Sequence, residues 1–365
     1  MYVLFFILPL VIMIPLMIYF YFFFKRILLV FYHDSIKKWM YIILALISFI
    51  FVVPAFNLFG FWAVVVLHIF AFGLFIDIFY WILKRKNKHY RFKKIYQLGI
   101  IPVLCLLMVL GYGYYNMKNV QERQYTIYTQ KDIHQDYCIA LITDLHFGNT
   151  MNQDELQSYC QKISQQSPDI VLLGGDIVDE RSSKEQMQQA FETLSTIQNQ
   201  YGIYYVYGNH DRATYSSKPS FTYDELIQTI ENNQIRILKD EWVSIQDDMY
   251  IMGREDRSIA DRSESREFLK TVNTEKFLLM LDHQPVDLTV NDQLGYDLQL
   301  SGHTHGGQMF PVGLISDFLG FGEMNYGYRQ MEHMQVIVSS GIAGWGYPLR
   351  TGSHSEYVII HLIKS

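Results

Sequence analysis

Side chains that could bind metal ions stand at or just after apolar runs in the last two-thirds of this sequence. They are carboxylates, imidazoles and one amide, which suit divalent manganese, iron or zinc. Two such ions about 3.5–4 Å apart can hold a phosphoryl group during in-line displacement. The residue types therefore predict phosphoester chemistry, carried by Asp144, His146, Asp176, Asn209, His283, His303 and His305.

An inert structural metal site is the alternative interpretation of these residues. Structural zinc sites are usually closed and rich in cysteine. The predicted ligands include no cysteine, and an additional histidine, His210, directly follows Asn209. This pattern favours a catalytic site.

The apolar runs predict the elements that position these side chains. Residues 138–143, 170–173 and 203–206 are short and rich in β-branched and aromatic residues, which is typical of buried strands. Amphipathic residues at 153–165 and 184–198 predict helices, the first capped by Asn152 and Glu155. This α/β alternation places the ligands at the carboxyl ends of strands. Further strands are expected near residues 249–252, 277–281, 297–300, 335–339 and 356–362.

Five motifs in this order resemble the calcineurin-like metallophosphoesterase family. The resemblance covers roughly residues 136–365 and implies an αββα sandwich of two sheets flanked by helices. Residues after 306 are similar to the bacterial membrane-associated branch of the family. The motifs are Thr-Asp-Leu-His-Phe-Gly (143–148), Gly-Gly-Asp-Ile-Val-Asp (174–179), Gly-Asn-His-Asp (208–211), Leu-Asp-His-Gln-Pro (281–285) and Gly-His-Thr-His-Gly-Gly-Gln (302–308).

The resemblance also implies a role for each predicted ligand. One divalent ion would be held by Asp144, His146 and His305, and the other by Asn209, His283 and His303. Asp176 would bridge the two, since a carboxylate offers two oxygens. Manganese is the expected metal, with iron or zinc as alternatives.

The resemblance assigns catalytic roles to the pair His210 and Asp211. His210 would protonate the leaving group, and Asp211 would orient its ring and favour its charged form. Asp179 is expected either to orient a ligand from behind or to lie in a solvated loop. Arg212 is expected to be an exposed structural residue, with contact to the substrate phosphate as the alternative.

Four apolar runs in the first third are each close to the length of about 20 residues that crosses a membrane. They are Met1–Phe24, Trp39–Asn57, Phe61–Leu83 and Leu98–Tyr115. We therefore predict an all-α transmembrane bundle at residues 1–116, a flexible linker at 117–135 and the metallophosphoesterase domain at 136–365. A signal anchor with fewer spans is the alternative.

Basic residues predict the orientation of these spans. Four lie in residues 25–38 and seven in residues 84–94, whereas the turn near 54–60 has none. The positive-inside rule makes both basic segments cytoplasmic, so the metallophosphoesterase domain is expected outside the cytoplasm of a bacterial cell. Within the third span, Asp77 is expected to be hydrated or paired with the basic loop, and His68 to hydrogen-bond another helix.

Other features set wider limits. A net charge of −6 gives no indication of nucleic-acid binding, and no protein partner can be inferred. Three cysteines allow at most the pair Cys138–Cys160, which is not implied to be a disulfide. The apolar residues within 309–324 are expected either to contact lipid or an acyl chain or to pack on their own domain.

These observations predict a membrane-anchored, dinuclear-metal hydrolase of phosphoester or pyrophosphate bonds in a lipid or cell-envelope substrate. Membrane lipids and the phosphoester substrate are then its partners. The alternative is a membrane sensor or scaffold with a non-catalytic metal site. The intact pair His210–Asp211 favours the enzyme.

Overall fold

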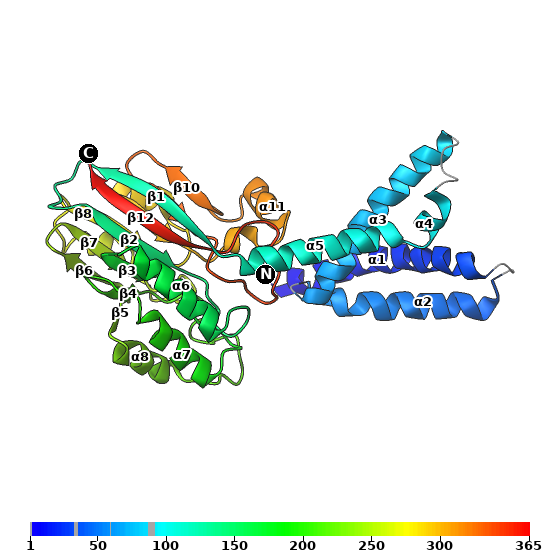
Figure 1. The fold of residues 1–365 in the computed structure, drawn as a ribbon, viewed down its shortest axis with the longest axis horizontal. Coiled ribbons are helices and arrows are strands. Elements are labelled where there is room, and N and C mark those ends of the chain that lie inside the picture. Colours follow the sequence, from blue (N-terminus) through cyan, green and yellow to red (C-terminus); the bar gives the residue numbers. More distant parts are fainter. Residues whose placement is uncertain (1, 33–35, 59, 87–91) are drawn as a thin grey trace. The chain divides into compact units, whose positions relative to one another are not determined.

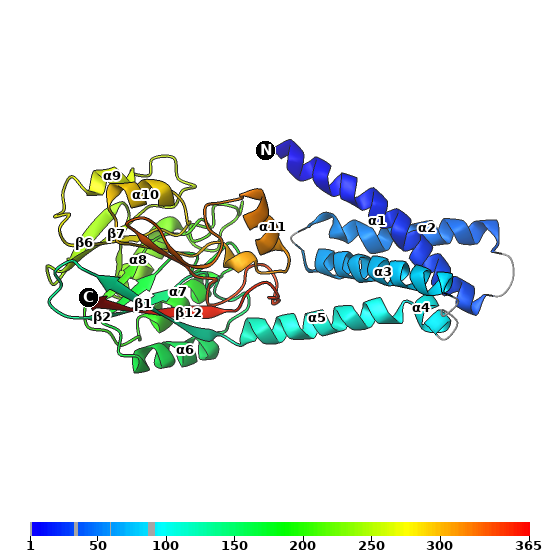
Figure 2. The ribbon, with the colours of Figure 1, turned by 90° about the horizontal axis from the view of Figure 1, so that it is seen from above.

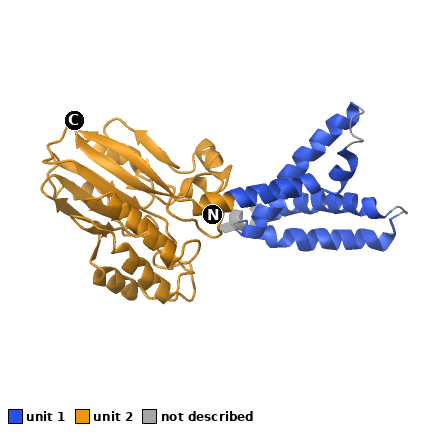
Figure 3. Cartoon of the chain, in the orientation of Figure 1, with its two compact units in different colours: residues 1–112 blue, residues 113–365 orange. Residues whose placement is uncertain are grey.

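The computed structural model describes residues 2–32, 36–58, 60–86 and 92–365. The chain forms two compact units, Met1–Tyr112 and Gly113–Ser365 (Figure 3). Among the described residues, every helix or strand of the first unit is a helix, and the second unit contains two β-sheets with their covering helices.

The helices of the first unit match the predicted apolar runs. Four segments are long and apolar enough to cross a membrane by length and composition: Leu10–Phe31, Lys38–Phe56, Phe61–Arg85 and Ile100–Lys118. The corresponding elements are α1 (Tyr2–Phe31), α2 (Lys38–Val52) with the short helix η1 (Val53–Phe56), α3 (Phe61–Arg85) and α5 (Ile100–Lys118), with the short α4 (Lys93–Gln97) before α5 (Figure 1).

Polar groups in the first unit correct two expectations. Arg26 lies inside α1 rather than in a loop, and its guanidinium pairs with Asp77, which also accepts a hydrogen bond from Tyr19 Oη at 3.1 Å. Asp77 is therefore paired with a residue of another helix rather than with the expected basic loop. His68 Nδ1 contacts the carbonyl of Val64 in its own helix at 2.8 Å, so the expected bond to another helix is wrong. Two predicted basic residues, Lys88 and Arg91, lie outside the described residues.

Two six-stranded sheets form the second unit (Figure 2). The first has the order β1-β12-β2-β3-β4-β5 and the second the order β10-β11-β9-β8-β7-β6. The strands of the first sheet are β1 (Gln121–Thr129), β12 (Glu356–Lys364), β2 (Tyr137–Ile142), β3 (Ile170–Leu173), β4 (Ile203–Tyr205) and β5 (Ile235–Ile237). Those of the second are β10 (Gly327–Gln330), β11 (Gln335–Val338), β9 (Leu298–Ser301), β8 (Phe277–Leu281), β7 (Met249–Gly253) and β6 (Glu241–Ile245).

Three buried layers show that this unit is the predicted αββα sandwich. Side chains alternate along a strand, and on β2 this sends Ala140 and Ile142 into the core beneath the helices and Ile139 and Leu141 into the core shared by the sheets. A third core lies against the other face of the second sheet. The helices that cover the first sheet are α6 (Gln153–Gln165), α7 (Lys184–Leu194) and α8 (Tyr223–Asn232). Residues of α9 (Ser265–Phe268) and α10 (Leu288–Leu294) belong to the third core. Helix α11 (Val312–Leu319) has no buried residue.

The predicted flexible linker at 117–135 is wrong. Residues Gln121–Thr129 form β1, which pairs in parallel with β12 along nine residues, from Gln121↔Glu356 to Thr129↔Lys364. Burial explains the pairing, because Ile127 is fully buried in the core between the sheets. The predicted capping box at Asn152 and Glu155 is confirmed at the start of α6, and all three cysteines are free.

Candidate metal centre

The loops that follow β2, β3, β4, β8 and β9 bring all seven predicted ligands to one edge of the sandwich. Asp144, His146 and His305 form one group, and Asp176, His283 and His303 form a second. Within each group, one potential ligand atom per residue lies within 4.8 Å of the others. Parallel neighbouring strands explain the convergence, because their carboxyl ends meet at the same edge.

Asp176, a member of the second group, also faces the first. Its Oδ2 atom is 3.7 Å from His146 Nε2 and 3.2 Å from His283 Nε2, while its Oδ1 atom accepts a hydrogen bond from the backbone N–H of His210 at 2.9 Å. One oxygen is thus fixed by the backbone and the other faces a histidine of each group. This is the arrangement that a bridging carboxylate requires.

Contacts behind two of the histidines, a hydrogen bond for His283 and an ion-pair contact for His146, leave the other ring nitrogen towards the centre. His283 Nδ1 lies 2.8 Å from the Gly174 carbonyl, which leaves Nε2 towards Asp176. His146 Nδ1 lies 3.4 Å from Asp179 Oδ2, so its Nε2 atom also points inward. Such contacts fix the tautomer and ring orientation of a metal ligand. Asp179 is buried, so the alternative of a solvated loop carboxylate is wrong, and its contact with His146 supports the orienting interpretation.

Unpartnered atoms indicate that the centre is built for an additional group. Among the buried polar atoms of the described residues, Asn209 Oδ1 and His283 Nε2 have no hydrogen-bond partner. Leaving such atoms unpaired costs about 1–3 kcal/mol each, whereas a cation would satisfy them. The donor set of oxygen and imidazole therefore fits divalent ions.

The pKa shifts of Asp176, His303 and His305 favour the deprotonated forms that bind cations, and His283 is the exception. Burial raises the pKa of Asp176, but His283 and His146 lower it further, to well below its usual range. Burial lowers the pKa of His305 to about 3 and, helped by His283, lowers that of His303. Burial also lowers the pKa of His283, but Asp176 and Asp144 raise it well above its usual value, so a cation there must displace a proton.

Several of the predicted metal ligands have unusual backbone conformations, which set the directions of their side chains. Five of the seven ligands have a positive φ, between 41° for His146 and 72° for His303. A positive φ costs a non-glycine residue on the order of 1–3 kcal/mol, and residues with such a φ cluster at functional sites. Neighbouring glycines permit the close approach, since a Cβ atom on Gly208 would lie 2.1 Å from Asp176 Oδ1 and one on Gly302 2.3 Å from Asp144 Oδ2.

His210 lies beside the two groups, with its ring 5.4 Å from that of His146. Its Nδ1 atom contacts Glu180 Oε1 at 2.7 Å. Burial lowers the pKa of His210, but Glu180 and Asp176 raise it above its usual value. Tyr215 and Trp345 flank the ring at 5.1 and 5.7 Å between centroids.

Asp211 does not orient the His210 ring, so that expectation is wrong. Its buried carboxylate accepts backbone hydrogen bonds from Asp176, Ile177, Val178 and Gly208 at 2.7–3.1 Å. Burial and the nearby Asp176 raise the pKa of Asp211 to about 6. Asp211 therefore holds the loop that carries Asp176, and Glu180 takes the position predicted for it.

Arg212 and Arg350 both contact protein groups that they hold in place. Arg212 pairs with Glu255 and stacks on Tyr207 and Tyr223, at 4.5 and 4.6 Å from the ring centroids, so it is structural but not exposed. Arg350 is fully buried, and its guanidinium donates to the carbonyls of His305, Ser340, Ala343 and His354. Sequence reasoning gave Arg350 no role, although it supports the loop that carries His305.

Comparison with known proteins identifies relatives of this chain. A family model described as calcineurin-like phosphoesterase matches residues 138–307. An uncharacterized metallophosphoesterase of Helicobacter pylori is 30% identical over 264 residues, which cover 70% of this chain and 69% of the relative. A transmembrane protein with metallophosphoesterase domain from Danio rerio is 28% identical and covers 61% of this chain, while this chain covers 52% of it. Among solved structures, a dimetal phosphatase from Danio rerio is similar with a TM-score of 0.38 and 12% identity, over 55% of this chain and 86% of that one.

Proposed function

Because this chain belongs to the calcineurin-like phosphoesterase family, we propose that it is a membrane-anchored dinuclear enzyme acting on a phosphorylated lipid or cell-envelope intermediate. Family membership makes it a metal-dependent phosphoester hydrolase. The substrate class, the ligand assignments and the placement outside the cytoplasm are the proposed parts.

The observation that carries the proposal is the position of Asp176, which belongs to one group of potential ligands and also faces the other. We assign one ion to Asp144, His146 and His305 and the other to Asn209, His283 and His303, with Asp176 bridging. When bound, the ions supply Lewis acidity toward a phosphoryl oxygen and lower the pKa of water. Manganese remains the expected metal.

The protein's own contribution to the proposed reaction is a general acid, His210, which its neighbours hold in position. His210 is partly buried beside the ligand groups, and Glu180 holds its Nδ1 atom, which leaves Nε2 to face a leaving group. Carboxylate neighbours favour the protonated ring. An alcohol leaves poorly as an alkoxide, so protonation by His210 would accelerate its departure.

The membrane anchor supports a substrate that resides at the membrane. Four candidate spans precede the domain, and α5 continues directly into the second unit. Anchoring keeps the site near lipids and near polymers assembled on them, although an anchored enzyme can also use soluble esters.

A hydrolysis screen of the purified full chain with Mn²⁺ tests the substrate class. The panel comprises phospholipids, lipid-linked pyrophosphates, soluble phosphodiesters and nucleotides, each presented with detergent. We expect the highest kcat/KM for a lipid-linked ester or pyrophosphate, and none for Asp176→Asn. A higher kcat/KM for nucleotides than for every lipid would exclude the proposed class.

A further inference from the structure

Helix α11 and its flanking residues carry an apolar surface whose side chains are about half exposed or more. None of the residues of α11 is buried, and Phe318 is 88% exposed. A helix packed on its own domain buries an apolar stripe, so the expectation that this segment packs on its domain is not met. We call this set the apolar α11 surface: Phe310, Val312, Leu314, Ile315, Phe318, Leu319 and Phe321.

The apolar α11 surface is almost uncharged. Asp317 is the one ionisable residue between Phe310 and Gly322 in the sequence. Fully burying a large apolar side chain contributes about 1.5–3 kcal/mol relative to leaving it in water. Exposed patches of this kind mark an interaction site, and the surroundings of the patch indicate its occupant.

The end of the last candidate span lies in the same unit as this surface. Tyr114 and Tyr115 on the last turns of α5 are 53% and 65% exposed, and exposed tyrosines at a span end are typical of the membrane–water interface. The loop at 349–355 is tied to these turns, because the Arg350 N–H donates to the Gly113 carbonyl at 3.0 Å and Asn116 Nδ2 donates to the Arg350 carbonyl at 3.0 Å.

The same loop is tied to the start of the apolar α11 surface. The backbone N–H of Phe310 donates to Thr351 Oγ1 at 3.0 Å, and the N–H of Thr351 donates to the Gln308 carbonyl at 2.8 Å. Arg350 and Thr351 are consecutive, so Gly113 and Phe310 are separated by on the order of 10 Å. The apolar surface therefore begins beside the point where α5 leaves the membrane.

We propose that the apolar α11 surface docks on the lipid bilayer, with Phe318 and its neighbours inserted among the lipids. The surface begins beside the interface marked by Tyr114 and Tyr115, and its Phe and Leu side chains are of the kind that enters the headgroup–acyl boundary. This inference concerns lipid contact and does not depend on which ester is hydrolysed.

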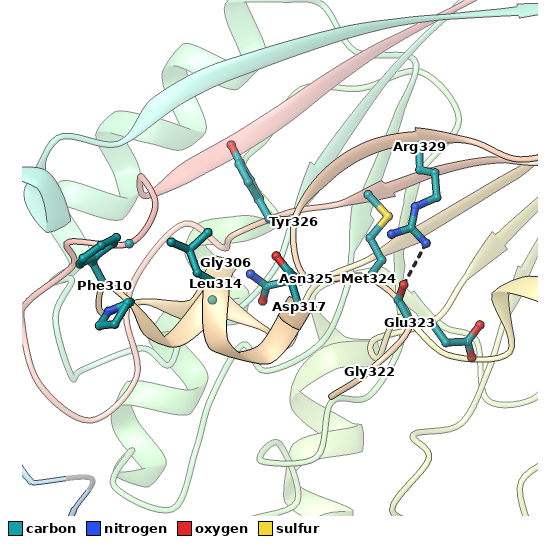
Figure 4. A pocket seen from close by; sticks show the side chains of 13 residues that line it. Gly306, Phe310, Leu314, Asp317, Gly322, Glu323, Met324, Asn325, Tyr326 and Arg329 are labelled. Carbon is teal, nitrogen blue, oxygen red and sulfur yellow. Dashed lines mark hydrogen bonds between the residues drawn. The ribbon is translucent and has the colours of Figure 1, made fainter. Parts of the chain in front are cut away.

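Two cavities connect this surface to polar groups. One, of about 390 Å³, is lined by Val312 and Phe321 of the apolar α11 surface and also by the candidate ligand His303. The other has Phe310 and Leu314 at one end and Glu323 and Arg329 at the other (Figure 4). Docking would therefore place lipid at one wall of a cavity that reaches the candidate metal centre.

Fluorescence quenching in bilayers tests the docking. The full chain, with Cys105, Cys138 and Cys160 replaced by alanine, carries Phe318→Cys labelled with an environment-sensitive dye, in nanodiscs with or without doxyl-labelled lipid. The matched control is Tyr128→Cys, which is 62% exposed near the far end of β1, about 23 Å from Gln121 at 3.3 Å per residue. We expect at least twofold quenching at position 318 and little at position 128.

Other outcomes would overturn the proposal. Equal and weak quenching at both positions would show that α11 stays in water. A blue-shifted but unquenched dye at position 318 would show that protein, such as a second copy of this chain, covers the surface. A second variant, Ile315→Gln with Leu319→Gln, should reduce the quenching at position 318, and an unchanged thermal midpoint would show that the fold is retained. Quenching is read without turnover, so a negative hydrolysis screen would leave this result standing.

Discussion

Asp176 contacts both groups of potential ligands in the candidate centre as well as the backbone of His210. Its two oxygens serve different partners, one the backbone of His210 and the other His146 and His283. A neutral amide in its place carries no charge, so it should bind the two proposed cations less tightly.

Asp176→Asn is therefore expected to abolish turnover and to lower the metal content below two ions per chain. Elemental analysis of the purified protein measures the metal content. The control is Asp154→Asn, which changes an exposed carboxylate on α6 and should alter neither value. Two tightly held ions with normal activity in Asp176→Asn would refute the bridging assignment.

The proposed acid, His210, gives a prediction that depends on the leaving group. His210→Ala should reduce turnover of alkyl esters by about 10²–10⁴-fold while the metal content stays constant. The loss should be much smaller for p-nitrophenyl esters, whose leaving group needs no proton. An equal loss for both ester types would point to a positioning role.

Glu180 should influence the reaction through His210. Glu180→Gln keeps the side-chain shape but removes a charge-assisted hydrogen bond worth about 1.5–3 kcal/mol, so turnover of alkyl esters should fall by about 10- to 100-fold. The loss should again shrink for p-nitrophenyl esters. Glu185→Gln, at an exposed carboxylate of α7, is the control, and losses independent of the leaving group would contradict the proposed contact.

Strand β1 is the element that most changes the interpretation of the chain. It makes residues 121–129 part of the sheet rather than a flexible connection, and Ile127 is its buried contribution.

Ile127→Ala should lower the free energy of unfolding of the second unit by about 2–5 kcal/mol because it leaves a cavity between the sheets. Tyr128→Ala changes an exposed neighbour and should cost no more than about 0.5 kcal/mol. Protease resistance of the purified full chain during heating measures the difference. Equal effects of the two substitutions would mean that β1 is not part of the folded unit.

The strands that carry ligands were predictable because they are buried on both faces. β3 and β8 have the predicted bounds, since every residue in them is buried and apolar. β1 gave no such signal, because most of its residues are polar and partly exposed on an edge strand. The motifs predicted the residues that the structure brings together as potential ligands, whereas Glu180 was missed because sequence does not show which neighbouring carboxylate reaches a ring. Asp211 was misassigned for the same reason.

At the scale of the whole molecule, charge sets the expected orientation. Seven Lys and Arg residues lie in 84–94 and four in 25–38, while Lys118, Arg123 and Lys131 alone closely follow the last span. A bias close to span ends directs the basic segments to the cytoplasm, so the second unit is expected outside it.

Reporter fusions at Ser365 test this orientation. An alkaline phosphatase fused there should be active, and a fluorescent protein that matures only in the cytosol should stay dark. Protease added to intact, wall-stripped cells should also digest the second unit. The reverse pattern would place the unit in the cytoplasm and direct the substrate search to cytosolic esters.

The insertion of β12 between β1 and β2 has a consequence for how the chain is made. Glu122 and Tyr357 meet across this junction although they are 235 residues apart. During synthesis, β1 and β2 must therefore each keep an open hydrogen-bonding edge until β12 has been made. Open edges pair readily with other chains, so the period between the synthesis of β1 and the synthesis of β12 is when a new chain is most exposed to aggregation.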